Sequence, residues 1–276
     1  MVGDYREQII TWLSAPDPSL SYNNALKARH KTTGTWFIKS DVFLRWALNA
    51  GSLLWLSEIP GCGKTILSST IIKYILDHCR QRPRSAVLYF YFSFNESGKQ
   101  RHENMIRSLV TQLILCQKSS SDVLDSLYSR GRQPTGEELL VTFHSMMTTY
   151  DEVFVVIDAL DECEERPELL SDIEEVMEWK DIHLHILVTS RKEADIEDSL
   201  NPLCDDGMSI CIHRASVDAD IRTYVHDRLL EDRRFRRWRD HTKVQQEIEN
   251  TLMGKANGMY VQTKHCQIHT YRGNMS

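Results

Sequence analysis

The sequence predicts an α/β fold built on a parallel sheet, with a short helical lead before the sheet and a helical subdomain after it. Three observations support this prediction. Several short apolar runs have the composition of buried strands, segments with helical spacing separate them, and a glycine-containing loop follows the first run. Because these runs are apolar on both faces, they fit a parallel sheet that helices cover on both sides.

The elements can be assigned in chain order. Residues 5–13 fit a short helix, and Pro16 and Pro18 then interrupt the chain, so we expect a separate small element before the sheet. The predicted strands are Ser52–Leu56, Ala86–Phe94, Val153–Ile157, Leu184–Val188 and Met208–Ile212.

Helical periodicity fills the intervals between the strands. Apolar residues recur on one face between Ile66 and Leu76 and again between Met105 and Ile114, as in helices packed on a sheet. Alternating strands and helices indicate right-handed crossovers. From Asp218 to about Met253 strand signals are missing, and the apolar spacing predicts a helical appendage.

Composition excludes several classes of protein. The 33 basic and 39 acidic residues give a net charge of -6, so no overall attraction to nucleic acid or membranes is expected. No segment is long and apolar enough to span a bilayer, and charges interrupt any N-terminal leader. Seven cysteines without a CxxC pair argue for reduced thiols. We expect a cytoplasmic protein without a membrane span or a nucleic-acid partner.

The first candidate site is the loop at residues 59–65, Ile-Pro-Gly-Cys-Gly-Lys-Thr. Glycines let backbone N–H groups surround a phosphate chain, and a helix that begins there directs its positive end at the same anion. Lys64 would add a positive charge, and the Thr65 hydroxyl would bind Mg²⁺. The predicted nucleotide-binding residues here are Pro60, Gly61, Cys62, Gly63, Lys64, Thr65 and Ile66.

Glu58 departs from the GxxxxGK[ST] pattern, which has its first glycine at this position. A carboxylate repels phosphate, and the lost glycine restricts the backbone. Since Glu58 stands at the entrance of the loop, its side chain could point to solvent. We therefore expect weakened binding, with a degenerate loop that binds no nucleotide as the alternative.

The second candidate site follows the strand at 153–157. An aspartate at the end of a buried parallel strand places a carboxylate at the carboxyl edge of the sheet, where Asp158 can hold Mg²⁺ through water. Asp161 or Glu162, on the exit loop, would orient or deprotonate an attacking water. The alternative is an ordinary buried strand followed by a solvated acidic turn.

The third candidate site is Arg191, which follows Thr189 and Ser190 at the end of another predicted strand. A guanidinium at this edge can sense the terminal phosphate. The alternative is an ion pair with nearby Glu193 or Asp195.

Two further patterns are weaker. The basic and aromatic run Arg233–Arg239 has acidic neighbours, so a solvated helix face is the better interpretation than a nucleic-acid patch. His265, Cys266 and His269 lack a second ligand cluster with zinc spacing and are taken as incidental.

With these motifs in view, the chain resembles fungal NACHT-type STAND proteins, the NLR-like signalling NTPases whose first domain is also described as nephrocystin-like. The resemblance extends from Ile10 to about Tyr260 and rests on several blocks in the same order. These blocks are Trp12-Leu13-Ser14 with Asp17-Pro18, Arg29-His30, Thr33–Ile38, Ser52–Leu56, Ile59–Thr65, Arg107–Leu113, Ile157–Cys163 and Val188–Arg191.

The resemblance implies an ASCE-type P-loop NTPase sheet, with an extra strand between the Walker A and Walker B strands. It implies Mg²⁺ and ATP, or GTP, as cofactors, slow hydrolysis, a homo-oligomer on activation and an effector protein as partner. Asp158 matches the Walker B aspartate, and Arg191 matches the sensor. Residues 61 and 63–65 match the Walker A loop.

The same resemblance places Thr33 and Gly34 near the base and ribose of a bound nucleotide. Trp36 and Phe37 belong to that segment, but core packing is the better interpretation for both.

The expected domains are a helical lead and linker at 1–30, a NACHT P-loop NTPase domain at 31–215, a helical subdomain at 216–262 and a disordered or aberrant tail at 263–276. Such proteins usually continue into a winged-helix segment and ankyrin or similar repeats, which these 276 residues do not include.

The function expected from the sequence is a nucleotide-controlled on/off switch for self-association. A degenerate, non-hydrolysing scaffold that acts through protein contacts is the alternative. A P-loop kinase or nucleic-acid motor is disfavoured, because no phosphate-acceptor site or basic groove supports it.

Overall fold

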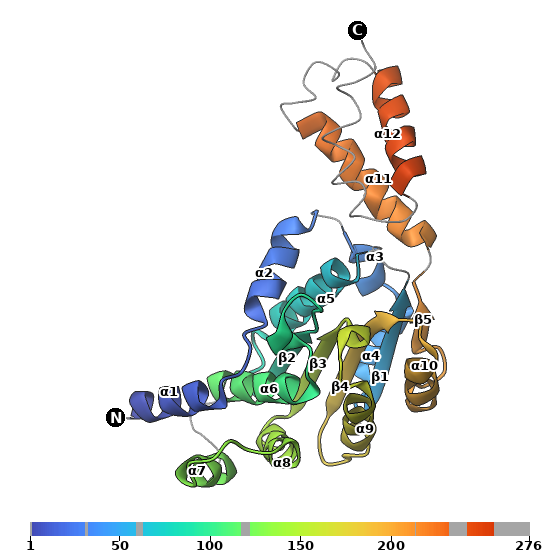
Figure 1. The fold of residues 1–276 in the computed structure, drawn as a ribbon. Helices are drawn as coiled ribbons and strands as arrows, with labels where there is room; N and C mark the ends of the chain where they lie inside the picture. The colour runs from blue at the N-terminus through green and yellow to red at the C-terminus, as the bar shows by residue number, and fades with distance from the viewer. Residues whose placement is uncertain are drawn as a thin grey trace.

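A five-stranded parallel sheet forms the centre of the molecule (Figure 1). The computed structural model describes residues 2–30, 33–58, 63–116, 122–212, 214–231 and 242–256. The strand order is β2-β3-β4-β1-β5, and every neighbouring pair is parallel. The strands are β1 (Ser52–Glu58), β2 (Ser85–Tyr91), β3 (Glu152–Asp158), β4 (Leu184–Arg191) and β5 (Ser209–Cys211). The α/β class is confirmed, and β4 lies between β1 and β3, as the resemblance implied.

All five predicted strands form, with shifted ends. β4 continues past Val188 as far as Arg191, which stands opposite Glu58 of β1 in the register. β2 ends earlier than predicted, because Ser93 N donates a hydrogen bond to Lys99 O and turns the chain out of the sheet. Phe94 therefore lies half exposed in the loop that follows.

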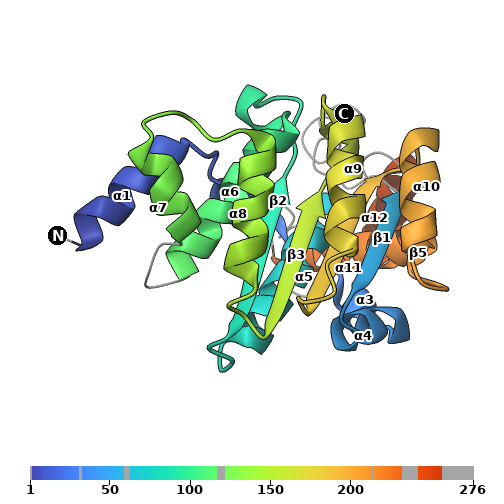
Figure 2. The same cartoon turned by 90° about the horizontal axis from the view of Figure 1, so that it is seen from below.

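Helices cover both faces of the sheet (Figure 2). The helices whose apolar residues pack on the first face, directly or through one another, are α1 (Val2–Leu13), α6 (His102–Cys116), α7 (Asp122–Ser129), α8 (Gly136–Met147), α9 (Arg166–Met177) and α10 (Ala194–Leu200). The second face is covered by α3 (Thr35–Ile38), α4 (Asp41–Leu48) and α5 (Lys64–Cys79), and α2 (Ser19–Ala28) packs against α5. Three short 3₁₀ helices complete this part: η1 (Ser97–Lys99), η2 (Leu160–Glu162) and η3 (Asn201–Leu203).

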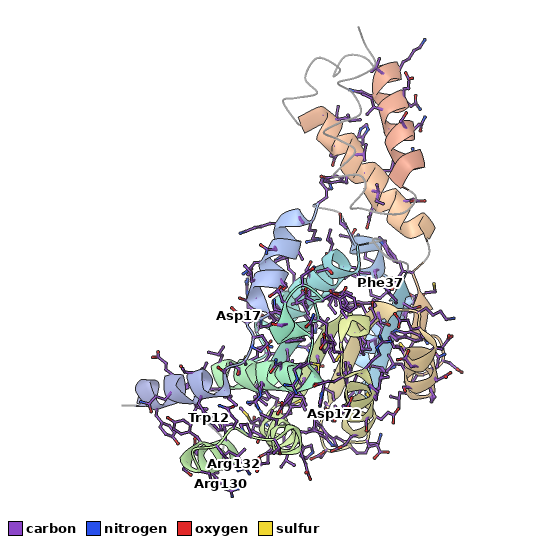
Figure 3. All side chains as sticks on the ribbon, viewed as in Figure 1. Trp12, Asp17, Phe37, Arg130, Arg132 and Asp172 are labelled. Carbon is purple, nitrogen blue, oxygen red and sulfur yellow. The ribbon has the colours of Figure 1, made fainter. Side chains whose placement is uncertain are left out.

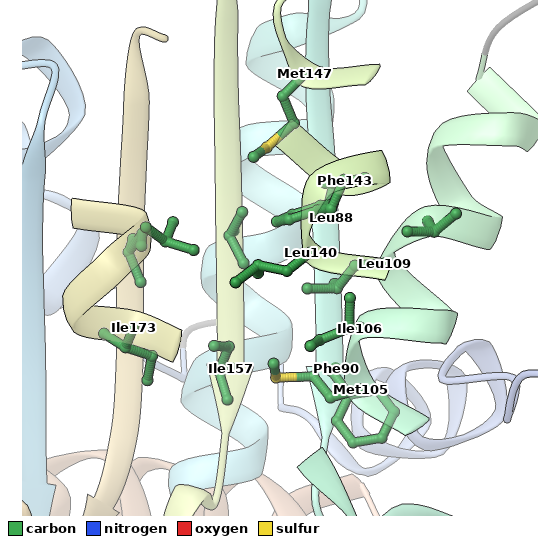
Figure 4. Packing of buried hydrophobic residues seen from close by; sticks show 14 of the residues in the cluster. Leu88, Phe90, Met105, Ile106, Leu109, Leu140, Phe143, Met147, Ile157 and Ile173 are labelled. Carbon is green, nitrogen blue, oxygen red and sulfur yellow. The ribbon is translucent and has the colours of Figure 1, made fainter. Parts of the chain in front are cut away.

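The strand side chains alternate between two buried apolar clusters, one on each face. On β3, Val155 belongs to the first cluster and Phe154 to the second. Figure 4 shows the first cluster, where Leu109 of α6 and Phe143 of α8 pack over the strands together with Ile173 of α9. Burial of alternate residues on opposite faces explains why the strands appear in the sequence as continuous apolar runs.

The first helix is not the separate element that the sequence predicted. Ile9 and Leu13 of α1 are fully buried in the first cluster, and Trp12 packs edge to face on Tyr128 of α7 at 5.4 Å between ring centroids. Figure 3 labels Trp12 at the end of α1. An apolar stripe at i, i+4 needs a partner, and α6 and α7 supply one.

Several helices were not assigned from the sequence, although local signals were present. Ser40 caps α4 by accepting a hydrogen bond from Phe43 N. Thr135 caps α8, and Glu138 completes a capping box with it. These caps satisfy backbone N–H groups that the first turn of a helix leaves free.

The helical appendage consists of α11 (Arg214–Glu231) and α12 (Thr242–Ala256), which pack against each other beyond α3 (Figure 1). Arg222 Nη1 lies 3.0 Å from Glu249 Oε1, which ties the two helices together. The basic run 233–239 and the tail 263–276, with His265, Cys266 and His269, lie outside the described residues. None of the helices in the described ranges is long and apolar enough to cross a membrane.

Candidate nucleotide-phosphate site

The predicted site residues of three separate segments meet at one edge of the sheet. β3 ends at Asp158 and β4 at Arg191, and α5 begins at Lys64. The carboxyl ends of parallel strands share an edge, which is where α/β proteins bind ligands. The convergence of the phosphate loop with the two strand ends therefore follows from the topology.

Only the second half of the glycine loop lies within the described residues. Residues 59–62, among them Pro60, Gly61 and Cys62, lie outside them. Gly63 is the N-cap of α5, with φ 100° and ψ 26°, a left-handed conformation that favours glycine. Ile66 is partly buried against the second apolar cluster, so its contact with a nucleotide stays a prediction.

Asp158 accepts hydrogen bonds from three hydroxyl groups. Thr65 Oγ1 donates to Asp158 Oδ2 at 2.8 Å, and Ser68 Oγ and Thr189 Oγ1 donate to Oδ1 at 2.5 and 2.7 Å. The aspartate is 1% exposed. Burial raises the pKa of Asp158, whereas the three hydroxyl groups and the charge of Lys64 act in the opposite direction.

This network suits a magnesium ion. The hydroxyl hydrogen of Thr65 points at Asp158, so the lone pairs of its oxygen remain available to a hard cation. The Asp158 carboxylate lies directly behind that hydroxyl, where it can hold the water of such an ion. Thr65 and Asp158 thus fit the metal-binding role that the sequence predicted for them.

Asp161 lies between the two cations that were predicted to contact phosphate. Arg191 N donates to Asp161 Oδ1 at 2.9 Å, and Arg191 Nε lies 3.1 Å from Oδ2. Lys64 Nζ is 4.0 Å from Oδ1. Asp161 is 2% exposed, yet Oδ2 accepts no well-aligned hydrogen bond, so its contact with Nε is an ion pair only.

The sequence-based alternative for Arg191 is wrong. Glu193 and Asp195 both pair with Arg166, and Arg191 pairs with Asp161. The strand directs the main-chain N–H and the side chain of Arg191 toward the loop after β3, away from its own sequence neighbours.

Glu162 occupies a different environment from Asp161. It is half buried, and its Oε2 accepts a hydrogen bond from Phe94 N at 3.0 Å. Burial raises the pKa of Glu162, and the charges of Asp161 and Asp158 add to that rise. Its Oε1 has no hydrogen-bond partner among the residues that the structure describes.

A strained turn connects these acidic residues. Ala159 has φ 57° and ψ 50°, a left-handed conformation that costs a non-glycine residue roughly 1–2 kcal/mol. Its N–H donates to Thr189 Oγ1 at 3.0 Å, which holds the turn in place. Strain of this kind often accompanies functional sites.

The predicted base-proximal segment packs against both α5 and α11. Gly34 has φ 75°, and a Cβ there would lie 2.9 Å from Leu67 Cδ1 of α5, so the position requires glycine. Thr33 O accepts a 3.5 Å hydrogen bond from Thr70 Oγ1. Gly34 N donates to Asp220 Oδ2 of α11 at 2.8 Å.

Asp220 also binds the side chain of Trp36, whose Nε1 donates to Oδ2 at 3.1 Å. Burial raises the pKa of Asp220. Phe37 is 1% exposed, which confirms core packing there, whereas Trp36 is only partly buried and adds this polar contact. Whether Thr33 and Gly34 meet a base stays a prediction.

Sequence reasoning missed Ser68, Thr189 and Asp220. Ser68 lies one helical turn after Thr65, a spacing that places both hydroxyls on one face and could have indicated its role. Asp220 carried no local signal, because its partner lies 186 residues away in the sequence.

One family of known proteins matches more than half of the chain. Residues 32–191 match the family described as "Nephrocystin 3, N-terminal", a range that contains all of the site residues except Asp220. No curated protein matches the chain by sequence.

Among solved structures, the chain is similar to the Aeropyrum pernix ORC2 protein in its ADP form, with 12% identity and a TM-score of 0.47 over 68% of this chain and 49% of that one. It is also similar to C. elegans PCH-2, with 15% identity and a TM-score of 0.38 over 94% of this chain and 59% of that one. The corresponding values for Drosophila ORC bound to DNA are 14%, 0.41, 91% and 62%. The chain spans about half the length of the first of these proteins.

Proposed function

The chain belongs to the nephrocystin 3 N-terminal family, and on that premise we propose that it is a NACHT-type nucleotide-binding module that binds Mg-ATP, or Mg-GTP, and hydrolyses it slowly. One observation carries the proposal. Lys64 and Arg191 face the same buried carboxylate, Asp161, beside a Thr65–Asp158 hydrogen bond that leaves the threonine oxygen open to a cation.

Each residue of the site would contact a different part of a bound Mg-nucleotide. The loop that ends at Gly63 would surround the phosphates, and Lys64 would neutralise their charge. Thr65 and Asp158 would hold Mg²⁺, which when bound would polarise the phosphate oxygens. Arg191 would contact the terminal phosphate. Because Lys64 and Arg191 now pair with Asp161, a phosphate group would compete with that carboxylate for both cations.

The two acidic residues of the exit loop would have different roles. Asp161 faces two cations, so we assign it to holding Lys64 and Arg191 in place. Glu162 has a raised pKa and an oxygen that no described residue occupies, so it would take the proton of the attacking water.

The switch would act through the helical subdomain. We propose residues 31–215 as the NTPase unit, 216–262 as a subdomain that responds to the nucleotide, and 1–30 as a lead; the tail 263–276 lies outside the described residues. Asp220 joins the two units through Gly34, so a nucleotide at this segment would alter their contact. Self-association on activation and an effector protein are the proposed consequences.

Titration calorimetry with Mg-ATP and Mg-GTP tests the proposal. Lys64→Ala should weaken binding by roughly 10- to 100-fold, since a charged contact is lost. Lys73→Ala is the matched control, because Lys73 lies on the same helix but pairs with Asp77 at 3.0 Å, away from the site. If the parent chain binds neither nucleotide, the proposal is wrong.

A second function remains open to test. A degenerate, non-hydrolysing scaffold, which binds nucleotide weakly or not at all and acts through protein contacts, is favoured by Glu58, which replaces the first glycine of the loop. Release of inorganic phosphate, measured under the conditions of the titration, distinguishes the two. Weak or absent binding without release would support the scaffold.

A further inference from the structure

Arg166 lies between the exit loops of β3 and β4. It is the first residue of α9, which lies beside α10 in Figures 1 and 2. Its Nη1 is 2.5 Å from Glu193 Oε2 and 3.0 Å from Asp195 Oδ2. Its Nη2 donates a 3.3 Å hydrogen bond to the main-chain oxygen of Asp161.

Two of these partners, Asp161 and Glu193, lie in segments next to site residues. Asp161 shares its loop with Glu162, and Glu193 closely follows Arg191. A single guanidinium thus connects the loop that carries the two acidic groups to the loop that carries the arginine sensor. A hydrogen bond from Arg191 N to Asp161 Oδ1 and the ion pair of Arg191 Nε with Oδ2 form a second connection between the same loops.

The contacts of Arg166 differ from an ordinary surface ion pair. The Arg84 and Asp151 side chains are each 65% exposed and pair with each other, and such exposed pairs contribute little to stability. The Arg166 side chain is 22% exposed and serves three partners at once. The planar guanidinium fixes the relative positions of its partners, which a lysine ammonium cannot do.

We propose that Arg166 is a positioning residue for hydrolysis, which holds Asp161 and Arg191 in register with Glu162 without touching the nucleotide. This inference rests on the proposed function. Thr65 and Asp158 are held by each other and by Ser68 and Thr189, through contacts that do not involve Arg166. Loss of Arg166 should therefore lower turnover while nucleotide affinity is kept.

The test compares Arg166→Gln and Arg166→Lys with the parent in two separate measurements. Single-turnover hydrolysis of ATP should fall by about 10- to 100-fold in Arg166→Gln, because small displacements of reacting groups have effects of this size. The Kd of Mg-ATP should stay within about twofold. Arg166→Lys should recover part of the rate, since it keeps the charge but loses the planar geometry.

Arg101→Gln is the matched control. Arg101 Nε pairs with Glu165 Oε1 at 2.8 Å, one residue before Arg166, but Arg101 is 55% exposed and does not contact Asp161. Its loss should leave turnover unchanged. Thermal unfolding of every variant shows whether the fold is kept.

The double variant Glu193→Gln, Asp195→Asn keeps Arg166 but removes the two carboxylates that pair with it. It replaces Arg166→Gln in the test if that variant does not fold. The double variant should lose as much turnover as Arg166→Gln does. Adding Arg166→Gln to the double variant should lower the rate little further, because the effects of substitutions at residues in contact do not add up. Parent-like turnover in both variants, or equal losses of rate and affinity, would overturn the inference alone. A parent chain that binds or hydrolyses no nucleotide would overturn it together with the proposed function.

Discussion

Two regions of the molecule are each organised around carboxylates, but in different surroundings. At the phosphate edge, Asp158 and Asp161 are at most 2% exposed, and their partners come from α5 and β4, which belong to the packed core. At the junction with α11, Asp220 is only partly buried, and it binds Gly34 N and the indole of Trp36.

The difference shows which part of the molecule is held rigidly. The described side chains at the edge lie on elements that the two apolar clusters hold in place. At the junction, Ile221 and Val225 of α11 are buried in the second cluster, and polar contacts are added to this packing, among them an ion pair of His30 Nε2 with Asp227 Oδ2 at 3.1 Å. The polar contacts of Asp220 and Asp227 are only partly buried, unlike those of Asp158 and Asp161, so a conformational change of α11 would break them first.

The largest expected effect comes from breaking the edge. Asp158→Asn should lower Mg²⁺-dependent nucleotide affinity by about 10- to 100-fold, because the carboxylate that holds the water of the ion is lost. Calorimetry in Mg²⁺ and in EDTA measures this. Asp172→Asn is the control, a half-buried carboxyl on α9 that Figure 3 labels and that pairs with His102 at 3.7 Å. An equal loss in EDTA would show that Asp158 acts without the metal.

Breaking the contact between Gly34 and Asp220 should have a smaller effect. It should lower the stability of the whole chain moderately and increase amide exchange mainly in α11 and α12. Asp220→Ala leaves the buried Gly34 N–H without its acceptor, which should lower the free energy of unfolding by about 1–3 kcal/mol. Urea unfolding measures the loss, and amide exchange should increase first in α11 and α12. Asp218→Ala, on the same helix, is the control. If both variants behave alike, Asp220 does not hold the junction.

The same contrast explains how far the sequence could predict the molecule. Continuous apolar runs predicted the strands, and a parallel sheet then requires that Asp158 and Arg191 share an edge. The partner of Arg191 could not be predicted, because Glu193 and Asp195 are nearer in sequence than Asp161, and only the direction of the strand decides between them.

The roles of polar residues inside helices could not be predicted from the sequence either. Ser68 of α5 appears in the sequence as a neutral helix position, and it becomes meaningful only when its hydroxyl meets Asp158. Asp220 resembles Asp218 and Asp227, other acidic residues of α11 that are also partly buried. Their roles depend on partners that tertiary packing supplies, so no local pattern reports them.

The stability of the folded chain should depend on pH through the buried Asp158. The folded state raises the pKa of Asp158 above its ordinary value of 3.8, so the folded chain holds that proton more tightly than the unfolded chain. The parent should therefore lose stability relative to Asp158→Asn as the pH rises from below 3.8 through the raised pKa. Urea unfolding over a pH series checks the sign. A difference that grew with pH in favour of the parent would contradict it.

The smallest expected effect concerns Glu58, which stands opposite Arg191 in the β1–β4 register. Glu58→Gly should tighten Mg-ATP binding by about fivefold, because one repulsive charge at the entrance of the loop is removed. Glu58→Gln removes the charge but leaves the backbone restricted, so it separates the two causes. If charge dominates, both variants bind more tightly and the gain shrinks at high salt. If backbone freedom dominates, only the glycine variant improves, and the gain is independent of salt. Unchanged affinity in both would show that Glu58 does not limit the site.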